Sequence, residues 1–202
     1  MKKSGFTLAE ILLSLAIIGI IAAVTIPSLL NLRPDTAKMK VIKCKNVLEK
    51  LNAELLDDSS IYALNDTCSG LDCTEPADEP AYNDVSGGNK YINLVARNLE
   101  TDTKYAKGTT TTLSDNSTIT TRDGIKWRFD GRTVTLSVDP KKSESLSCMY
   151  PSCDKPNKFQ LKVNNDGSVS GDDPMSKAYF DNPKKFNDKK TDLKNAKTYS
   201  ES

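Results

Sequence analysis

An apolar run from Phe6 to Leu30 constrains this chain more than any other feature, because Glu10 is its only charged residue. As a helix, about 25 residues with a rise of 1.5 Å each extend roughly 37 Å, which is enough to cross a bilayer. Lys2 and Lys3 precede the run and favour a cytoplasmic N-terminus, although basic residues also follow it. We therefore predict a hydrophobic transmembrane or assembly helix over residues 6–30.

Two ordinary explanations compete for this run. A secretory signal peptide would be removed after its apolar stretch, but the run is long for that role, contains an acid and offers a poor cleavage context at Thr25-Ile26-Pro27. A plain membrane anchor would leave Glu10 to reach the interface, about 10 Å along the helix from Lys3. An ionised side chain within the bilayer costs on the order of 3 kcal/mol, so Glu10 needs a partner.

The chain resembles the type IV pilin and type II secretion pseudopilin family in its first residues, KKSGFTLAE (2–10), followed by an apolar helix that contains Pro27. In that family a prepilin peptidase cuts after the glycine and methylates the new N-terminal residue, and the fifth mature residue is glutamate. The resemblance implies a leader peptide over residues 1–5, cleavage between Gly5 and Phe6, and methylation of Phe6.

The same resemblance implies that Glu10 pairs with the new amine of Phe6 on a neighbouring subunit and sets the register of a growing filament. Pro27 should kink or loosen the helix, because it removes a backbone hydrogen bond. The implied partners are prepilin peptidase, other pilin or pseudopilin subunits and an assembly machinery in the bacterial inner membrane. A single-pass chain of this kind would have a periplasmic or extracellular C-terminal domain.

A second, amphipathic helix is predicted over residues 31–56. Its apolar residues recur three and four positions apart, at Ala37, Val41, Cys44, Leu48, Leu51 and Leu55. The lysines of the segment, Lys38 among them, lie mostly off this stripe. The stripe needs a cover, and the sheet predicted below is the candidate.

Residues 57–116 are predicted to be an acidic, variable loop region with a short helix near Lys90–Leu99. Ten acidic residues between positions 57 and 103 stand against Lys90 and Arg97, and proline and glycine interrupt the segment. We expect this region to attract the basic amphipathic helix of a neighbouring protomer, which reversal of Lys43 and Lys45 would test.

Alternation of apolar and polar residues predicts an antiparallel sheet over residues 117–172. The clearest runs begin at Ile125, Val134 and Phe159, and Asp123-Gly124 and Asp130-Gly131 are turn signals. The predicted fold class is therefore α+β and pilin-like, with the long N-terminal helix packed on a small antiparallel sheet. Residues 173–202 are rich in lysine and poor in apolar residues, so we expect a flexible basic tail; nucleic-acid contact is the disfavoured alternative to a solvated tail.

Four of the five cysteines form two C-x4-C units, Cys68 with Cys73 and Cys148 with Cys153. A four-thiolate zinc site is one explanation. Disulfides are favoured for a domain outside the cytoplasm, with their connectivity left open. Cys44 is then the remaining thiol, placed as a small buried hydrophobe on the helical stripe.

The loop 164–173 contains three carboxylates, Asp166, Asp172 and Asp173, together with two glycines. Hard oxygen ligands on such a loop suit calcium, and major type II pseudopilins carry calcium in a comparable loop. The alternative is a turn followed by a solvated acidic loop. No other cofactor is expected.

The composition excludes several enzyme classes. The chain has no histidine, which removes Ser-His-Asp and Cys-His centres and histidine metal sites, and it lacks phosphate-loop, dinucleotide and nucleophile-elbow motifs. We predict a non-catalytic subunit of a type II secretion pseudopilus or type IV pilus-like filament. The alternatives are a membrane-anchored extracytoplasmic binding protein that never polymerises, and a secreted metal-binding domain behind a signal peptide.

Overall fold

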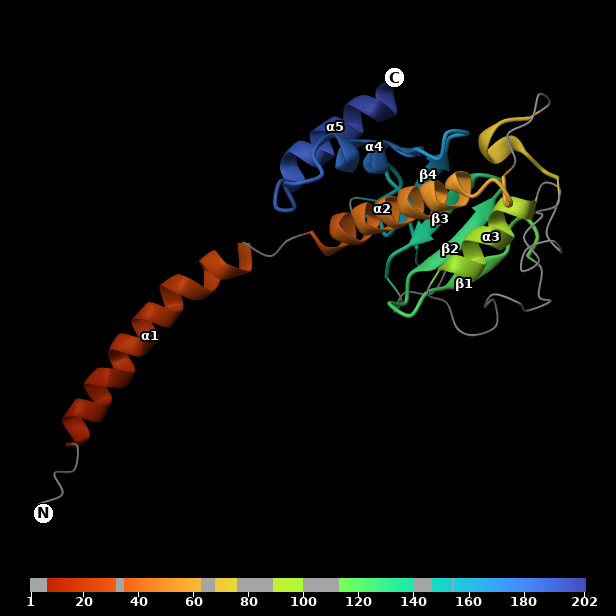
Figure 1. Cartoon of the computed structure of the whole chain (residues 1–202). Coiled ribbons are helices and arrows are strands. Elements are labelled where there is room, and N and C mark those ends of the chain that lie inside the picture. Colours follow the sequence, from red (N-terminus) through yellow and green to blue (C-terminus); the bar gives the residue numbers. More distant parts are fainter. Residues whose placement is uncertain are drawn as a thin grey trace, which may run out of the picture. The chain divides into compact units, whose positions relative to one another are not determined.

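The computed structural model describes residues 7–31, 35–62, 68–75, 89–99, 113–139, 147–153 and 155–202. The chain divides into two units, Met1–Asp35 and Thr36–Ser202. The first contains helix α1 (Leu8–Asn31), and the second begins with helix α2 (Thr36–Asp57) and contains all other elements (Figure 1).

A five-stranded antiparallel sheet forms the centre of the second unit. The strands follow one another in space as in sequence, which makes a meander. They are β1 (Thr118–Thr120), β2 (Lys126–Asp130), β3 (Thr133–Ser137), β4 (Lys158–Val163) and β5 (Val169–Gly171). Gly131 and Gly167 have positive φ in the turns before β3 and β5, as tight reversals require. The predicted sheet and the α+β class are confirmed.

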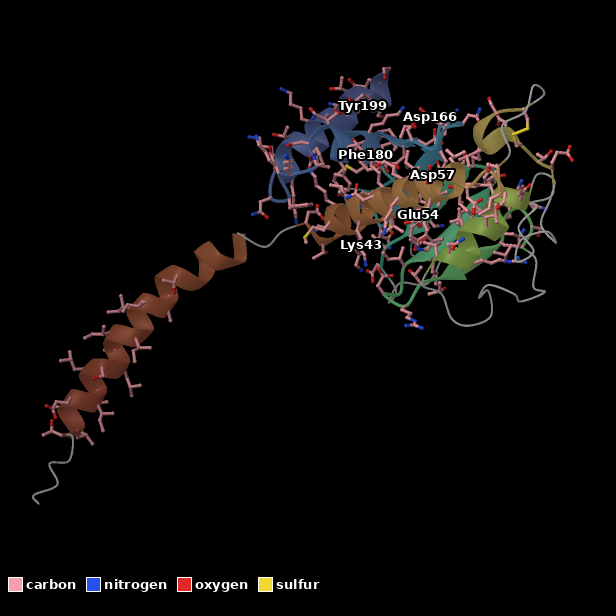
Figure 2. The ribbon with its side chains drawn as sticks, viewed as in Figure 1. Lys43, Glu54, Asp57, Asp166, Phe180 and Tyr199 are labelled. Atoms are coloured by element: carbon pink, nitrogen blue, oxygen red, sulfur yellow. A yellow bond between two sulfur atoms is a disulfide. The ribbon has the colours of Figure 1, made fainter. Side chains whose placement is uncertain are left out.

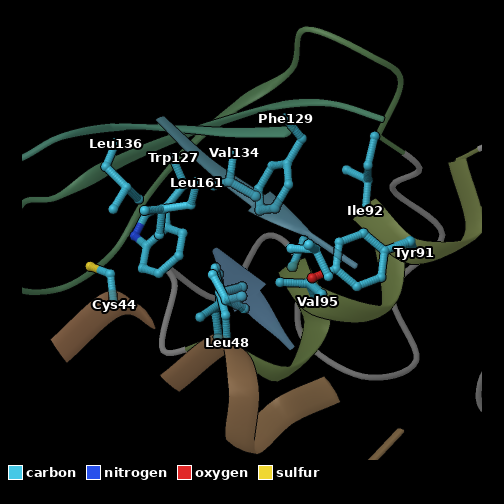
Figure 3. Packing of buried hydrophobic residues seen from close by; sticks show 14 of the residues in the cluster. Cys44, Leu48, Tyr91, Ile92, Val95, Trp127, Phe129, Val134, Leu136 and Leu161 are labelled. Carbon is cyan, nitrogen blue, oxygen red and sulfur yellow. The ribbon is translucent and has the colours of Figure 1, made fainter. Parts of the chain in front are cut away.

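One face of the sheet is apolar because buried residues alternate along each strand. The register places Trp127 opposite Leu136, and Val134 opposite both Phe129 and Leu161. All five side chains are at most 3% exposed. Figure 3 shows them facing Leu48 of α2 and Val95 of helix α3 (Lys90–Asn98), so the core lies between the sheet and these two helices.

Helix α2 buries the predicted stripe, with Val41, Cys44, Leu48 and Leu55 at most 4% exposed. Two polar residues of α2, Lys38 and Asn52, are also fully buried, so the expectation that Lys38 lies off the buried side is wrong. The Asn52 amide donates to the Gly167 carbonyl at 2.8 Å and accepts from the Tyr91 hydroxyl at 3.0 Å. Asn52 thereby joins α2 to the β4–β5 turn and to α3.

Between α2 and the sheet, the described residues include the predicted short helix, α3, and a 3-10 turn, η1 (Gly70–Asp72). The turn is attached to the β4–β5 loop, because Asn165 accepts from the backbone N–H groups of Leu71 and Asp72. Arg132 and Asp72 form an ion pair at 2.7 Å beside it. Much of the acidic stretch, including 76–88 and 100–112, lies outside the described residues.

The C-terminal segment is not a flexible tail. Residues 174–201 contain helices α4 (Pro174–Asp181) and α5 (Lys189–Glu201), which pack on each other. Met175, Ala178 and Tyr179 of α4 and Ala196 of α5 are buried. The expectation for 173–202 is therefore wrong, because a few well-spaced apolar residues and two aspartate N-caps, Asp173 and Asp188, suffice to order the segment.

Candidate functional site

Helix α1 exposes large hydrophobic side chains between Leu8 and Ile21. Their exposed fractions run from 50% at Ile17 to 78% at Leu8. A helix that is apolar all round is normally covered by lipid or by other protein. In the parts of the chain that the structure describes, no helix reaches the length and apolarity required to cross a membrane.

The N-terminus of α1 is closed by a reciprocal pair, Thr7 and Glu10. The Glu10 carboxylate accepts from the Thr7 N–H at 2.8 Å and from the Thr7 hydroxyl at 2.9 Å, while the Glu10 N–H donates to the Thr7 hydroxyl at 3.3 Å. This is a capping box, in which a threonine and a glutamate three residues later satisfy each other's backbone donors. The Thr-x-x-Glu spacing was present in the sequence, but the prediction for Glu10 did not use it.

The capping box holds the Glu10 carboxylate in place through one of its two oxygens. Both Thr7 donors bond to Oε2, one of the two carboxylate oxygens of Glu10, and the Glu10 side chain is exposed at the start of the helix. A carboxylate accepts up to about four hydrogen bonds, so this one retains capacity for a cation. Glu10 therefore presents an acceptor at the end of an apolar helix.

The other residues of the predicted processing site are placed in part. Gly5 and Phe6 lie outside the described residues. Pro27 lies inside α1, four residues before its end at Asn31. The cleavage, the methylation and the kink at Pro27 stay predictions.

Two disulfides close the C-x4-C units. Cys68 bonds to Cys73 and Cys148 to Cys153. In each unit the cysteine bonds to the other cysteine of the same unit. The four sulfur atoms are therefore not thiolate ligands for a zinc ion. The expectation of disulfides is confirmed.

Cys44 is the remaining thiol, and it is buried. Burial, with a smaller contribution from the nearby Asp123 carboxylate, raises the pKa of this thiol to about 12. The neutral thiol is thus favoured in the fold, as expected of a small core residue.

Cys44 should resist alkylation by iodoacetamide at pH 8 in the folded chain and react after denaturation, because the thiolate is the nucleophile. The folded state keeps this proton at pH values where the unfolded chain loses it, so stability should fall as pH rises from about 9 towards about 12. Peptide mapping of alkylated samples measures the first effect. Rapid labelling of Cys44 without unfolding would contradict it.

The three carboxylates proposed for calcium do not form one site. Asp173 is 3% exposed and acts as the N-cap of α4, accepting from the N–H groups of Met175 and Ser176, and it also accepts from the Gln160 N–H at 2.6 Å. Asp166 accepts from the Ser168 N–H and hydroxyl, which hold the pKa of this exposed carboxyl below its usual range. Within the described residues no three metal-ligating side chains converge. Asp166 and Asp173 instead close a turn and begin a helix.

A buried ion pair, which sequence reasoning missed, joins α2 to the C-terminal helix. The Lys38 ammonium lies 2.7 and 2.8 Å from the two carboxylate oxygens of Asp192, and both side chains have no exposed surface. Lys38 also donates to the Lys185 carbonyl at 3.1 Å and lies 5.4 Å from the centre of the Tyr179 ring. The pair fixes α5 against the first turns of α2.

Comparisons with known proteins bear on the N-terminal segment. Residues 1–26 match the family model of the prokaryotic N-terminal methylation motif. Over 73 residues the chain is 38% identical to Type II secretion system core protein G of Pseudomonas aeruginosa, a match that covers 35% of this chain and 49% of that protein. The chain thus spans about half the length of this curated relative. No solved structure matches it significantly.

Proposed function

We propose that this chain is a non-catalytic structural subunit of a pilin-like filament, because its residues 1–26 match the prokaryotic N-terminal methylation motif. The similarity to a type II secretion core protein favours a pseudopilus over other filaments of this class. The proposal also fits a helix whose large apolar side chains are exposed between Leu8 and Ile21. A membrane-anchored chain in the bacterial inner membrane, with the second unit on the extracytoplasmic side, is part of this proposal.

The single observation that carries the proposal is the placement of Glu10 at the start of that apolar helix within the motif. Cleavage after Gly5 makes Phe6 the new N-terminus, four residues before Glu10. The exposed carboxylate is then a counter-charge for the amine of another subunit, and such pairing offsets the cost of a charge in an apolar surrounding. The partners are prepilin peptidase and further pilin or pseudopilin subunits.

Processing tests this proposal independently of assembly. We expect the chain isolated from cells that contain prepilin peptidase to begin at N-methylated Phe6, and the chain from cells lacking the peptidase to begin at Met1. Intact mass and N-terminal sequencing distinguish the two. A start near residue 25 would instead indicate a signal peptide, and Met1 in both strains would indicate an unprocessed anchor.

A further inference from the structure

The charges of helix α2 run in the order that its own dipole disfavours. Its N-terminal half, residues 36–46, contains lysines and no acid, whereas its last turns contain acids and no base in the final turn. A helix favours negative charge at its N-terminus and positive charge at its C-terminus. A charge order that opposes the helix dipole is expected at a functional surface, where the charges of a partner compensate for it.

The lysines of α2 divide into those held within the fold and those on its surface. Lys38 is buried with Asp192, Lys40 donates to the Val138 carbonyl at 2.7 Å, and Lys45 pairs with Glu49. Lys43 and Lys50 have 64% and 79% of their side chains exposed. Their ion pairs with Asp123 at 3.1 Å and Glu54 at 3.6 Å are exposed pairs of low net energy, so both lysines can exchange partners.

Lys43 and Lys50 lie on a ridge between two hollows. One hollow, of about 440 Å³, is lined on its other side by Leu99 and Trp127. The second, of about 430 Å³, is lined by Met39, Ile42 and Phe186. Lys43, Val47 and Lys50 line both hollows, and we call these three residues the basic ridge. It combines exposed cations with apolar walls, as protein interfaces do.

The opposite end of α2 is acidic. Asp57 and Asp58 are exposed there, and we call them the acidic end. Lys90, the next basic residue after Asp58 in the sequence, is 3% exposed, and its ammonium bonds to the Ile61 carbonyl at 2.6 Å and to the Glu75 carbonyl. The Lys90 ammonium is therefore directed into the fold, while the carboxylates of Asp57 and Asp58 are exposed. Figure 2 shows Lys43 near the start of α2 and Asp57 near its end.

We propose that the basic ridge of one copy of this chain binds the acidic end of a second copy. The two surfaces are complementary in charge, and Lys43 and Asp57 are about 21 Å apart along one helix by its rise per residue. Two different complementary patches on one molecule make a heterologous contact, which propagates head to tail as an open polymer. This inference rests on the proposed filament function and specifies the contact between subunits outside the N-terminal helix.

Charge exchange between two variants of the full chain tests the contact. The first variant, Lys43→Glu with Lys50→Glu, makes both surfaces acidic, and the second, Asp57→Lys with Asp58→Lys, makes both basic. Each alone should reduce the filament fraction roughly tenfold or more, because like charges meet. Co-expression should restore filaments, since the two variants can alternate. Lys189→Glu with Lys194→Glu, on the exposed side of α5, is the matched control and should assemble normally.

Restoration on mixing excludes misfolding as the cause of the single losses. If either variant alone assembles as the unchanged chain does, or if the co-expressed variants form no filaments, the proposed contact is wrong. The proposed filament function would still stand in both cases. If the unchanged chain forms no filaments beside a complete assembly system, both proposals fail.

Cross-linking fixes the geometry of the contact. Asn46 and Asp57 are both exposed on α2, and Asn46→Cys combined with Asp57→Cys should give an oxidised ladder of multimers in the full chain. Either substitution alone should give no ladder. A product that stops at the dimer would indicate a closed antiparallel pair and would overturn the head-to-tail arrangement.

Discussion

Replacing Asp192 with alanine should lower the free energy of unfolding by about 3–5 kcal/mol, because the Lys38 ammonium would stay buried without its counter-charge. A domain has only about 5–15 kcal/mol of stability in total, so the loss is large. Urea unfolding of the full chain measures it. The single tryptophan of the sequence, Trp127, is 3% exposed in the core and supplies a local fluorescence signal.

Two further variants separate the buried charge from simple loss of helix α5. Lys38→Met with Asp192→Leu removes both charges, and most of the stability should return, since apolar replacements of a buried pair are often neutral. Asp188→Ala removes the N-cap of α5 and should cost only about 1 kcal/mol. An Asp192→Ala variant no less stable than Asp188→Ala would contradict the account of this ion pair.

The parts of the fold that could be predicted are those with a regular apolar period. The apolar stripe of α2 and the alternation in β2, β3 and β4 each arise from residues on one side of a single helix or strand. The sequence of that element alone is therefore enough to predict it. The short helix α3 and the presence of disulfides were also predicted, whereas the pairing of the four cysteines was left open and is given by the structure.

The C-terminal helices could not be predicted from their composition. Lys38 lies 154 residues from Asp192 in sequence, and no local pattern indicates that a lysine is buried when its partner is so distant. The role of Asp173 was also not predicted, although its partners lie closer in the sequence. An acid in a glycine-containing loop fits a cation ligand and an N-cap equally well, and the following Pro174, a frequent first residue of helices, was the signal that favoured the cap.

Replacing Glu10 is expected to abolish filament assembly while leaving the second unit folded. Alanine would remove both the charge and the capping box, so glutamine is the sharper variant. Glutamine also serves at position N3 of a capping box and can keep the bond to Thr7, but it carries no charge for a neighbouring amine. Thr7→Ala is the converse control, because it removes the cap and keeps the carboxylate.

The most direct test of the filament account is the amount of this chain in sheared surface filaments, measured by immunoblot and electron microscopy in cells with a complete assembly system. We predict filaments from the unchanged chain and from Thr7→Ala, and none from Glu10→Gln, with all three chains present in the membrane at similar levels. Normal filaments from Glu10→Gln would contradict the role of Glu10 as the counter-charge that positions each new subunit.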